Sequence, residues 1–216
     1  MSISFKNYVG VFWRNLIHLV KANLLFWLFC LPVVTIPAAL TGLHTVCADA
    51  VRGKTDGVFK TFVAAGKEKF GRSLAAWLLY ALLFFLSATA VSFYMGLRSS
   101  MTLVLIPEGI ALAVAMIAAA MLPYSFTLLA QTDLGLRDIV KNSFLMVFLE
   151  PKTTIVSFLV CGIWIFVQVV FFMKLFAFVL VIGVSLAVFT GTYFSMYGLL
   201  KRVITGENDG KSGILG

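Results

Sequence analysis

The sequence contains few residues that could perform catalysis or bind a metal ion, and their spacing forms no recognisable site. His18 and His44 are the two histidines, and neither lies in a His-x-x-x-His or Glu-x-x-His pattern. The three cysteines, Cys30, Cys47 and Cys161, lie in or beside apolar segments and form no Cys-x-x-Cys pair. This pattern fits reduced cysteines that pack among helices and supplies no ligand set for zinc.

A carboxylate inside a membrane segment usually marks a functional site. Glu108 is the one acidic residue within a long apolar segment, but it follows Pro107, and this pair is typical of the first turn of a helix. The sequence has no glycine-rich phosphate loop, no Ser-x-x-Lys and no Gly-x-Ser-x-Gly stretch. We therefore expect no catalytic residue, no cofactor and no metal site, and a protein that is not an enzyme.

The stretch LPVVTIP, residues 31–37, is the feature most able to create a ligand site. Pro32 and Pro37 interrupt an apolar run, and a proline removes a backbone donor and clashes with the preceding turn. We expect two helical pieces joined by a short extended link, with Thr35 capping the second piece and satisfying freed backbone groups. The break could have a purely structural role. Alternatively, the unwound backbone at the break could bind a ligand.

The composition of the chain predicts that these residues lie on the helices of an integral membrane protein. Hydrophobic residues make up 61% of the 216 residues and charged residues 12%, whereas soluble domains are about half apolar and a quarter charged. We expect an all-α polytopic membrane protein with one domain over residues 1–205 and a disordered tail over 206–216. An amphipathic helix over residues 5–21 should lie on the bilayer. The predicted spans are about 24–46, 74–97, 107–130, 153–173 and 175–200.

Small residues four apart predict two faces for close helix packing, and either face could form an interface with a partner helix. The first ridge is Ala88, Ser92 and Gly96, and the second is Gly183, Ala187, Gly191 and Ser195. A polar path through the bundle would have to use His44, Thr190 and Thr192, together with Thr35 and Ser195.

The net charge of +8 comes from Lys and Arg in short segments between the spans. This placement follows the positive-inside rule and argues against nucleic-acid binding. Residues 49–73, residues 131–152 and the C-terminus hold 12 of the 17 Lys and Arg, so we expect these segments to be cytoplasmic. Within them, the amphipathic stretches 56–72 and 133–148 should rest on anionic lipid or engage a partner.

The side on which the N-terminus lies depends on the proline break. A kinked crossing over residues 24–46 places the N-terminus outside, whereas a re-entrant hairpin with LPVVTIP at its tip places it inside. Charge placement prefers the hairpin. We predict the crossing, because the run is long enough to span and re-entrant segments are the rarer solution.

Several of these residues resemble a known family. Asn23, Trp27, residues 31–36, Ala38 and Leu43 resemble the N-terminal signature of the YesL-like bacterial membrane proteins, which carry the domain of unknown function 624. Phe59, Phe62 and Phe70, and the stretch 122–154, are similar to two further regions of that family. Pro37 stands where Gly is usual in the family, and His44 stands where Tyr is usual.

The resemblance implies a bacterial plasma-membrane protein without an established activity, whose relatives are often encoded beside carbohydrate ABC-transporter genes. We therefore expect an accessory or assembly subunit that contacts lipids and, through one packing ridge, an ABC permease subunit. The alternative is a small transporter or channel that works as a homo-oligomer. The sequence leaves the oligomeric state open.

Overall fold

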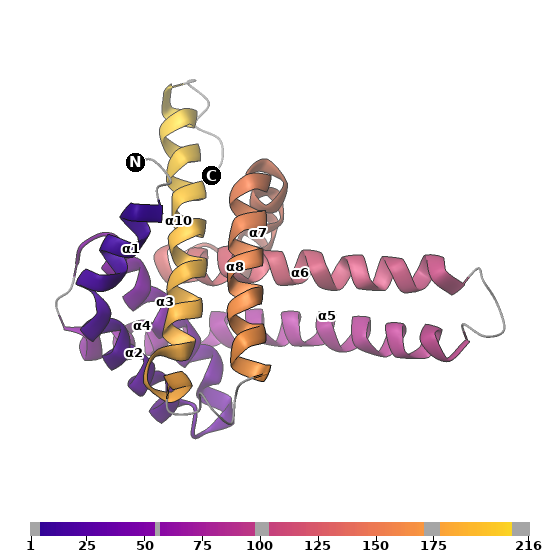
Figure 1. Cartoon of the computed structure of the whole chain (residues 1–216), viewed down its shortest axis with the longest axis horizontal. Coiled ribbons are helices and arrows are strands. Elements are labelled where there is room, and N and C mark those ends of the chain that lie inside the picture. The colour runs from indigo at the N-terminus through magenta and orange to yellow at the C-terminus, as the bar shows by residue number, and fades with distance from the viewer. Residues whose placement is uncertain (1–4, 55–56, 98–103, 171–177, 209–216) are drawn as a thin grey trace.

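The computed structural model describes residues 5–54, 57–97, 104–170 and 178–208, and over these residues it contains helices and no strand. Figure 1 shows their arrangement. Five stretches are long and apolar enough to cross a membrane: Val33–Val51, Phe70–Leu97, Leu105–Gln131, Pro151–Val170 and Val179–Leu199. The predicted all-α polytopic fold is confirmed.

The N-terminal helix is broken where the sequence predicts one continuous helix over residues 5–21. Helix α1 (Phe5–Arg14) ends at the buried Asn15, and α2 (Leu16–Phe29) begins directly after it. The Asn15 amide donates hydrogen bonds to the carbonyls of Val11, at 2.9 Å, and Ala50, at 3.3 Å. The break at Asn15 therefore divides the predicted helix over residues 5–21 between α1 and the start of α2, and it anchors the chain to α3.

The aromatic face of α1 packs on protein instead of facing only lipid. The Tyr8 ring lies edge-on to Tyr193, with centroids 5.3 Å apart, and its hydroxyl is 2.8 Å from that of Thr190. Phe12 packs on Phe189 of the same helix, α10 (Val184–Asn208). Helix α1 is therefore part of the molecule's main hydrophobic core.

LPVVTIP forms the tip of a helical hairpin, so residues 24–46 do not form one kinked helix that continues in a single direction. Helix α2 runs to the tip, a short 3₁₀ turn η1 (Val33–Thr35) follows, and α3 (Ile36–Val51) returns. The bond from Asn15 to Ala50 joins the start of α2 to the end of α3. At 1.5 Å per residue, the 14 residues of α2 extend only about 21 Å, which is too short for a 30 Å hydrocarbon core.

Helix α4 (Val58–Glu68) lies directly against α3. The two backbones approach closely because each helix has a glycine at the contact. A Cβ atom added to Gly42 would lie 2.7 Å from the Phe62 carbonyl oxygen, and one added to Gly66 would lie 3.2 Å from that of Ala38. Phe62 and Ala65 are buried here, whereas Phe59 is 62% exposed. The predicted amphipathic segment thus packs on protein through one face.

Helices α5 (Phe70–Leu97) and α6 (Leu105–Gln131) form a long second hairpin. Its near part packs on the rest of the chain through Tyr80, Ala118 and Met121. Its far part leaves the other helices and runs across the direction of α8 (Pro151–Val170) and α10 (Figure 1). The five candidate spans therefore do not all share one direction. We call the exposed part, residues 81–97 and 105–117, the arm.

The remaining elements close the core. Helix α7 (Leu136–Leu149) corresponds to the predicted amphipathic stretch 133–148. The last span begins with a π-helical segment, η3 (Val179–Gly183), and α10 continues to Asn208, past the predicted start of the tail at residue 206. The predicted end of the fourth span at residue 173 and the predicted start of the fifth span at residue 175 lie outside the described residues. Tail residues 209–216 also lie outside them.

Candidate functional site at the helix break

The backbone at the break is short and tightly bonded. Pro32 is extended, with φ −82° and ψ 119°, but Val33–Thr35 form a 3₁₀ turn where an extended link was predicted. The Thr35 hydroxyl donates to the carbonyls of Phe29 and, at 2.6 Å, Pro32. Thr35 occupies the N-cap position of α3, yet its side chain makes no capping bond. Thr35 thus bonds two carbonyls beside the break, and both lie on the α2 side.

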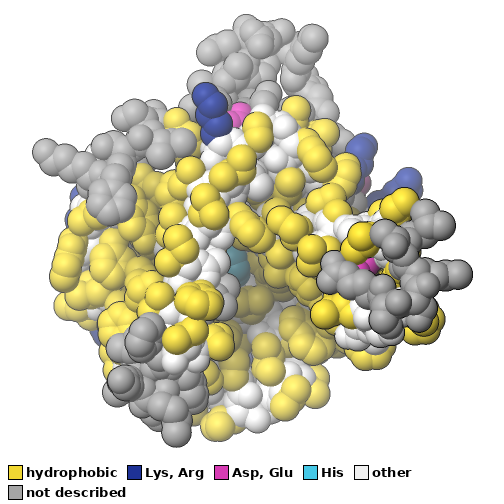
Figure 2. Space-filling view, turned by 45° about the vertical axis from the view of Figure 1, so that its right-hand side comes forward, with side chains coloured by type: hydrophobic (Ala, Val, Ile, Leu, Met, Phe, Trp, Pro, Cys, Tyr) yellow, Lys and Arg dark blue, Asp and Glu magenta, His cyan; other side chains and the backbone are white. Residues whose placement is uncertain are grey.

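The tip of the hairpin presents large apolar side chains outward. Leu31 is 78% exposed, Val33 69% and Val34 63%. Such a cluster is unfavourable in water and favourable in a bilayer. Hydrophobic side chains also cover most of the face shown in Figure 2, with Lys and Arg along its margin.

An apolar cleft of about 300 Å³ opens beside the break. Five elements meet around it: the end of α2, the turn η1, the start of α3, the second half of α4 and the first residue of α5. Its polar lining is limited to Thr35, whose hydroxyl is already bonded, and Lys67, which is exposed. The remaining described lining residues are Phe29, Ala38, Ala39, Phe62, Val63, Gly66 and Phe70.

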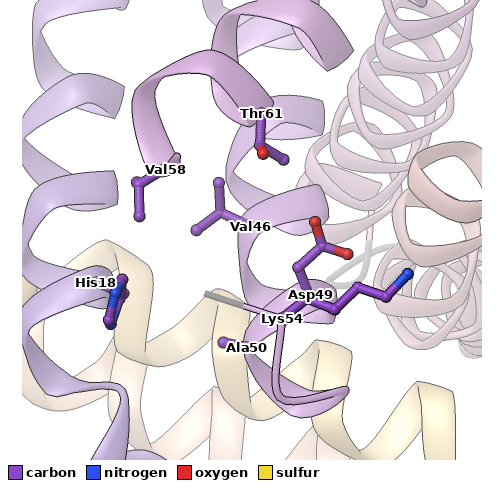
Figure 3. Close-up of a pocket in the computed structure, with 7 residues that line it drawn as sticks. All are labelled: His18, Val46, Asp49, Ala50, Lys54, Val58 and Thr61. Carbon is purple, nitrogen blue, oxygen red and sulfur yellow. The ribbon is translucent and has the colours of Figure 1, made fainter. Parts of the chain in front are cut away.

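A smaller polar pocket lies at the open end of the same hairpin (Figure 3). His18 comes from α2, and Asp49 from α3; Lys54 follows α3, and the pocket has room for about one water molecule, at roughly 10 Å³. His18 Nδ1 is buried without a hydrogen-bond partner among the described residues. Figure 3 shows His18 on the opposite side of the pocket from Asp49 and Lys54, so these groups do not form an acid–base pair.

Three of the residues proposed for a polar path bond to other residues of the chain, whereas the buried Ser195 hydroxyl has no hydrogen-bond partner among the described residues. His44 Nδ1 lies 2.9 Å from the Thr192 hydroxyl, and its ring stacks on Phe126 with centroids 5.6 Å apart. Thr190 pairs with Tyr8 and donates to the Leu186 carbonyl at 2.8 Å. His44, Thr190 and Thr192 are all buried. Their hydrogen bonds join α1 and α3 to α10.

The two small-residue ridges have different surroundings. In the second ridge, Gly183 at the end of η3 and Gly191 and Ser195 on α10 are buried, and Ala187 is half-buried. A Cβ atom on Gly191 would lie 3.3 Å from Pro123 Cβ. That ridge packs the chain's own helices, so it is not a free partner surface. Ala88, Ser92 and Gly96 are exposed on the arm, and a Cβ atom on Gly96 would meet nothing within 4 Å.

Asn23 holds the helix-break hairpin to the last span, a role that the sequence analysis missed. Its amide donates to the carbonyls of Val179, at 3.2 Å, and Leu180, at 2.6 Å, and its oxygen accepts from the Ser185 backbone at 2.8 Å. A π segment shifts the backbone bonds and leaves carbonyls to other partners. Trp164 and Gln168 each bond the Gly183 carbonyl at 3.0 Å. The sequence signal that could have indicated this role is a lone Asn within an apolar run.

Lys69 joins the two basic segments. Its ammonium donates to the carbonyls of Ala130, at 3.1 Å, and Thr132, at 3.0 Å, where α6 ends. Asp133 lies 3.1 Å from Arg72 and 3.8 Å from Lys69. Burial lowers the pKa of Lys69, and the nearby Asp133 opposes this shift. A cation at a helix C-terminus is favourable, so this contact fixes residues 67–73 beside 130–134.

Comparisons with known proteins concern this same hairpin. Residues 19–90 match the family described as "Protein of unknown function, DUF624". The resemblance seen in the sequence is thus confirmed over α2 after its first turn, the break, α3, α4 and the first part of α5. No curated protein and no solved structure matches the chain.

Proposed function

We propose that this protein is a non-enzymatic accessory or assembly subunit that binds another membrane protein through its α5–α6 arm. The observation that carries the proposal is that no other described helix covers the arm. Leu82, Phe85, Leu86 and Phe93 are each more than half exposed, and the small-residue ridge lies free among them. Small residues allow a second helix to approach closely, which lipid chains do not require.

The partner that the family resemblance favours is a permease subunit of a carbohydrate ABC transporter in a bacterial plasma membrane. The contact between Lys69 and the end of α6 supports placing both basic segments on one side of the membrane, with the C-terminus. The hairpin at the break supports an N-terminus on that side as well. A stand-alone transporter is less supported, because His44, Thr190 and Thr192 already bond within the chain.

The test is purification of the tagged full chain from its native membrane in mild detergent, with mass spectrometry of co-purified proteins. We expect a stoichiometric permease subunit. Ala88→Leu should remove it by steric exclusion, whereas Ala113→Leu, the same change at an exposed arm residue of α6 away from the ridge, should retain it.

A homomer without any permease, or a complex that Ala88→Leu leaves intact, would refute this assignment of the arm. The first result would make transport by the protein itself the leading explanation.

A further inference from the structure

We infer that the apolar cleft beside the helix break binds one acyl chain of an anionic membrane phospholipid, with the headgroup at Lys67. This inference is independent of the arm and concerns the opposite hairpin. Ligand pockets in proteins occupy about 300–1,000 Å³. The cleft, at about 300 Å³, lies at the lower end of this range and suits a single alkyl chain.

The lining selects an alkyl chain over a polar ligand. Phe29, Phe62, Val63 and Phe70 supply side chains from three helices, and Ala38 and Ala39 leave the space between them. The Thr35 hydroxyl is committed to two backbone carbonyls. A sugar or a peptide entering here would leave its own polar groups without partners, at a high desolvation cost.

The position of the cleft brings it within reach of lipid. Leu31, Val33 and Val34 project from the adjoining tip and are mostly exposed, so the tip is suited to burial among acyl chains. The turn η1 lies in this tip and also forms part of the cleft wall. The lipid acyl chains that surround the tip can therefore reach the cleft. Thr35 belongs to both features.

Charge selects the headgroup. Lys67 is the one charged residue among the described residues that line the cleft, and it is exposed. Lys60 lies two helical turns earlier on α4 and is also exposed, while the neighbouring Glu68 carries the opposite charge. The positive charge of Lys67 at the rim favours a lipid whose headgroup has a net negative charge, such as phosphatidylglycerol.

The experiment uses the full chain reconstituted in phosphatidylcholine vesicles that contain a trace of phosphatidylglycerol with a diazirine on one acyl chain. After irradiation, peptide mapping should place the label on residues 29–39 and 58–70. Lys67→Glu should lower this labelling at least fivefold. Lys60→Glu, which makes the same charge change on the same helix outside the cleft, should lower it less than twofold.

Val63→Phe narrows the cleft and should remove most labelling at Phe29, Phe62 and Phe70. If this variant does not fold, Lys67→Glu, a surface change, still decides the question. Label spread evenly over the exposed faces of α5, α6 and α8 would overturn the site. Equal labelling by a phosphatidylcholine probe, or equal loss from Lys60→Glu and Lys67→Glu, would overturn headgroup selection at Lys67.

Discussion

The α2–α3 hairpin and the α5–α6 arm are both paired apolar helices, but they use their polar side chains in different ways. In α2–α3, Asn23 bonds to the last span, Thr41 pairs with Ser73 of α5 at 2.7 Å, and His44 pairs with Thr192. In the arm, the Thr89 hydroxyl donates to carbonyls of its own helix, Phe85 and Leu86. The polar side chains of α2–α3 thus bond to residues distant in the sequence, whereas the Thr89 hydroxyl of the arm bonds to its own helix.

This difference indicates which hairpin holds the molecule together and which is available to others. A buried polar group without a partner costs free energy, so side chains that bond across the chain fix the position of α2–α3. In the described part of the arm, the Thr89 hydroxyl bonds within its own helix, and the exposed apolar surface is left for lipid or a partner. The DUF624 match covers the first hairpin and ends within the α5 part of the arm, at residue 90.

The strongest test of this comparison is Asn23→Leu. Leucine has a similar volume but lacks the side-chain amide of Asn23. The Val179 and Leu180 carbonyls and the Ser185 backbone N–H would therefore lose the partner that bonds them. We expect a loss of about 3 kcal/mol in the free energy of unfolding. The measurement is thermal unfolding in mild detergent, followed by the loss of the monodisperse peak in gel filtration.

Gln168→Leu is the matched control, because the Gly183 carbonyl keeps its bond from Trp164. We expect this variant to lose about 1 kcal/mol or less. Equal losses from the two variants would show that Asn23 does not hold the hairpin to the last span.

A smaller effect is expected from the contact between α3 and α4. Gly42→Ala places a methyl group 2.7 Å from the Phe62 carbonyl oxygen, so the helices must separate. We expect a loss of about 2 kcal/mol, typical of overpacking. In the same thermal unfolding assay, Gly109→Ala on the arm should be neutral or slightly stabilising, because its added methyl meets nothing within 4 Å. A neutral Gly42→Ala would contradict the close approach.

The smallest effect on stability is expected on the arm itself. Ala88→Leu adds bulk at an exposed position, so the free energy of unfolding of the isolated chain should change by less than about 0.5 kcal/mol. This result would separate loss of a partner from loss of the fold. A marked decrease in the unfolding temperature of the purified chain would instead place Ala88 against the chain's own helices.

Much of the architecture was predictable from local sequence. Long apolar runs predicted the helices of α5, α6 and α8, and the two amphipathic stretches predicted α4 and α7, because length and periodicity are local properties. The residues of LPVVTIP predicted a break with Thr35 as a backbone partner, since proline chemistry acts within one turn. The family resemblance was also readable from these residues and their neighbours.

Which surfaces meet was decided by the tertiary structure. The break is a hairpin tip because Asn15 reaches Ala50, the α10 ridge is internal because Pro123 packs on Gly191, and the α5 ridge is exposed because no described helix covers it. Two ridges with the same spacing carry the same local pattern, so spacing alone does not tell them apart. The sequence by itself determined a helical membrane protein with a break at residues 31–37. Contacts between residues distant in the chain determined what lies inside and what is left for a partner.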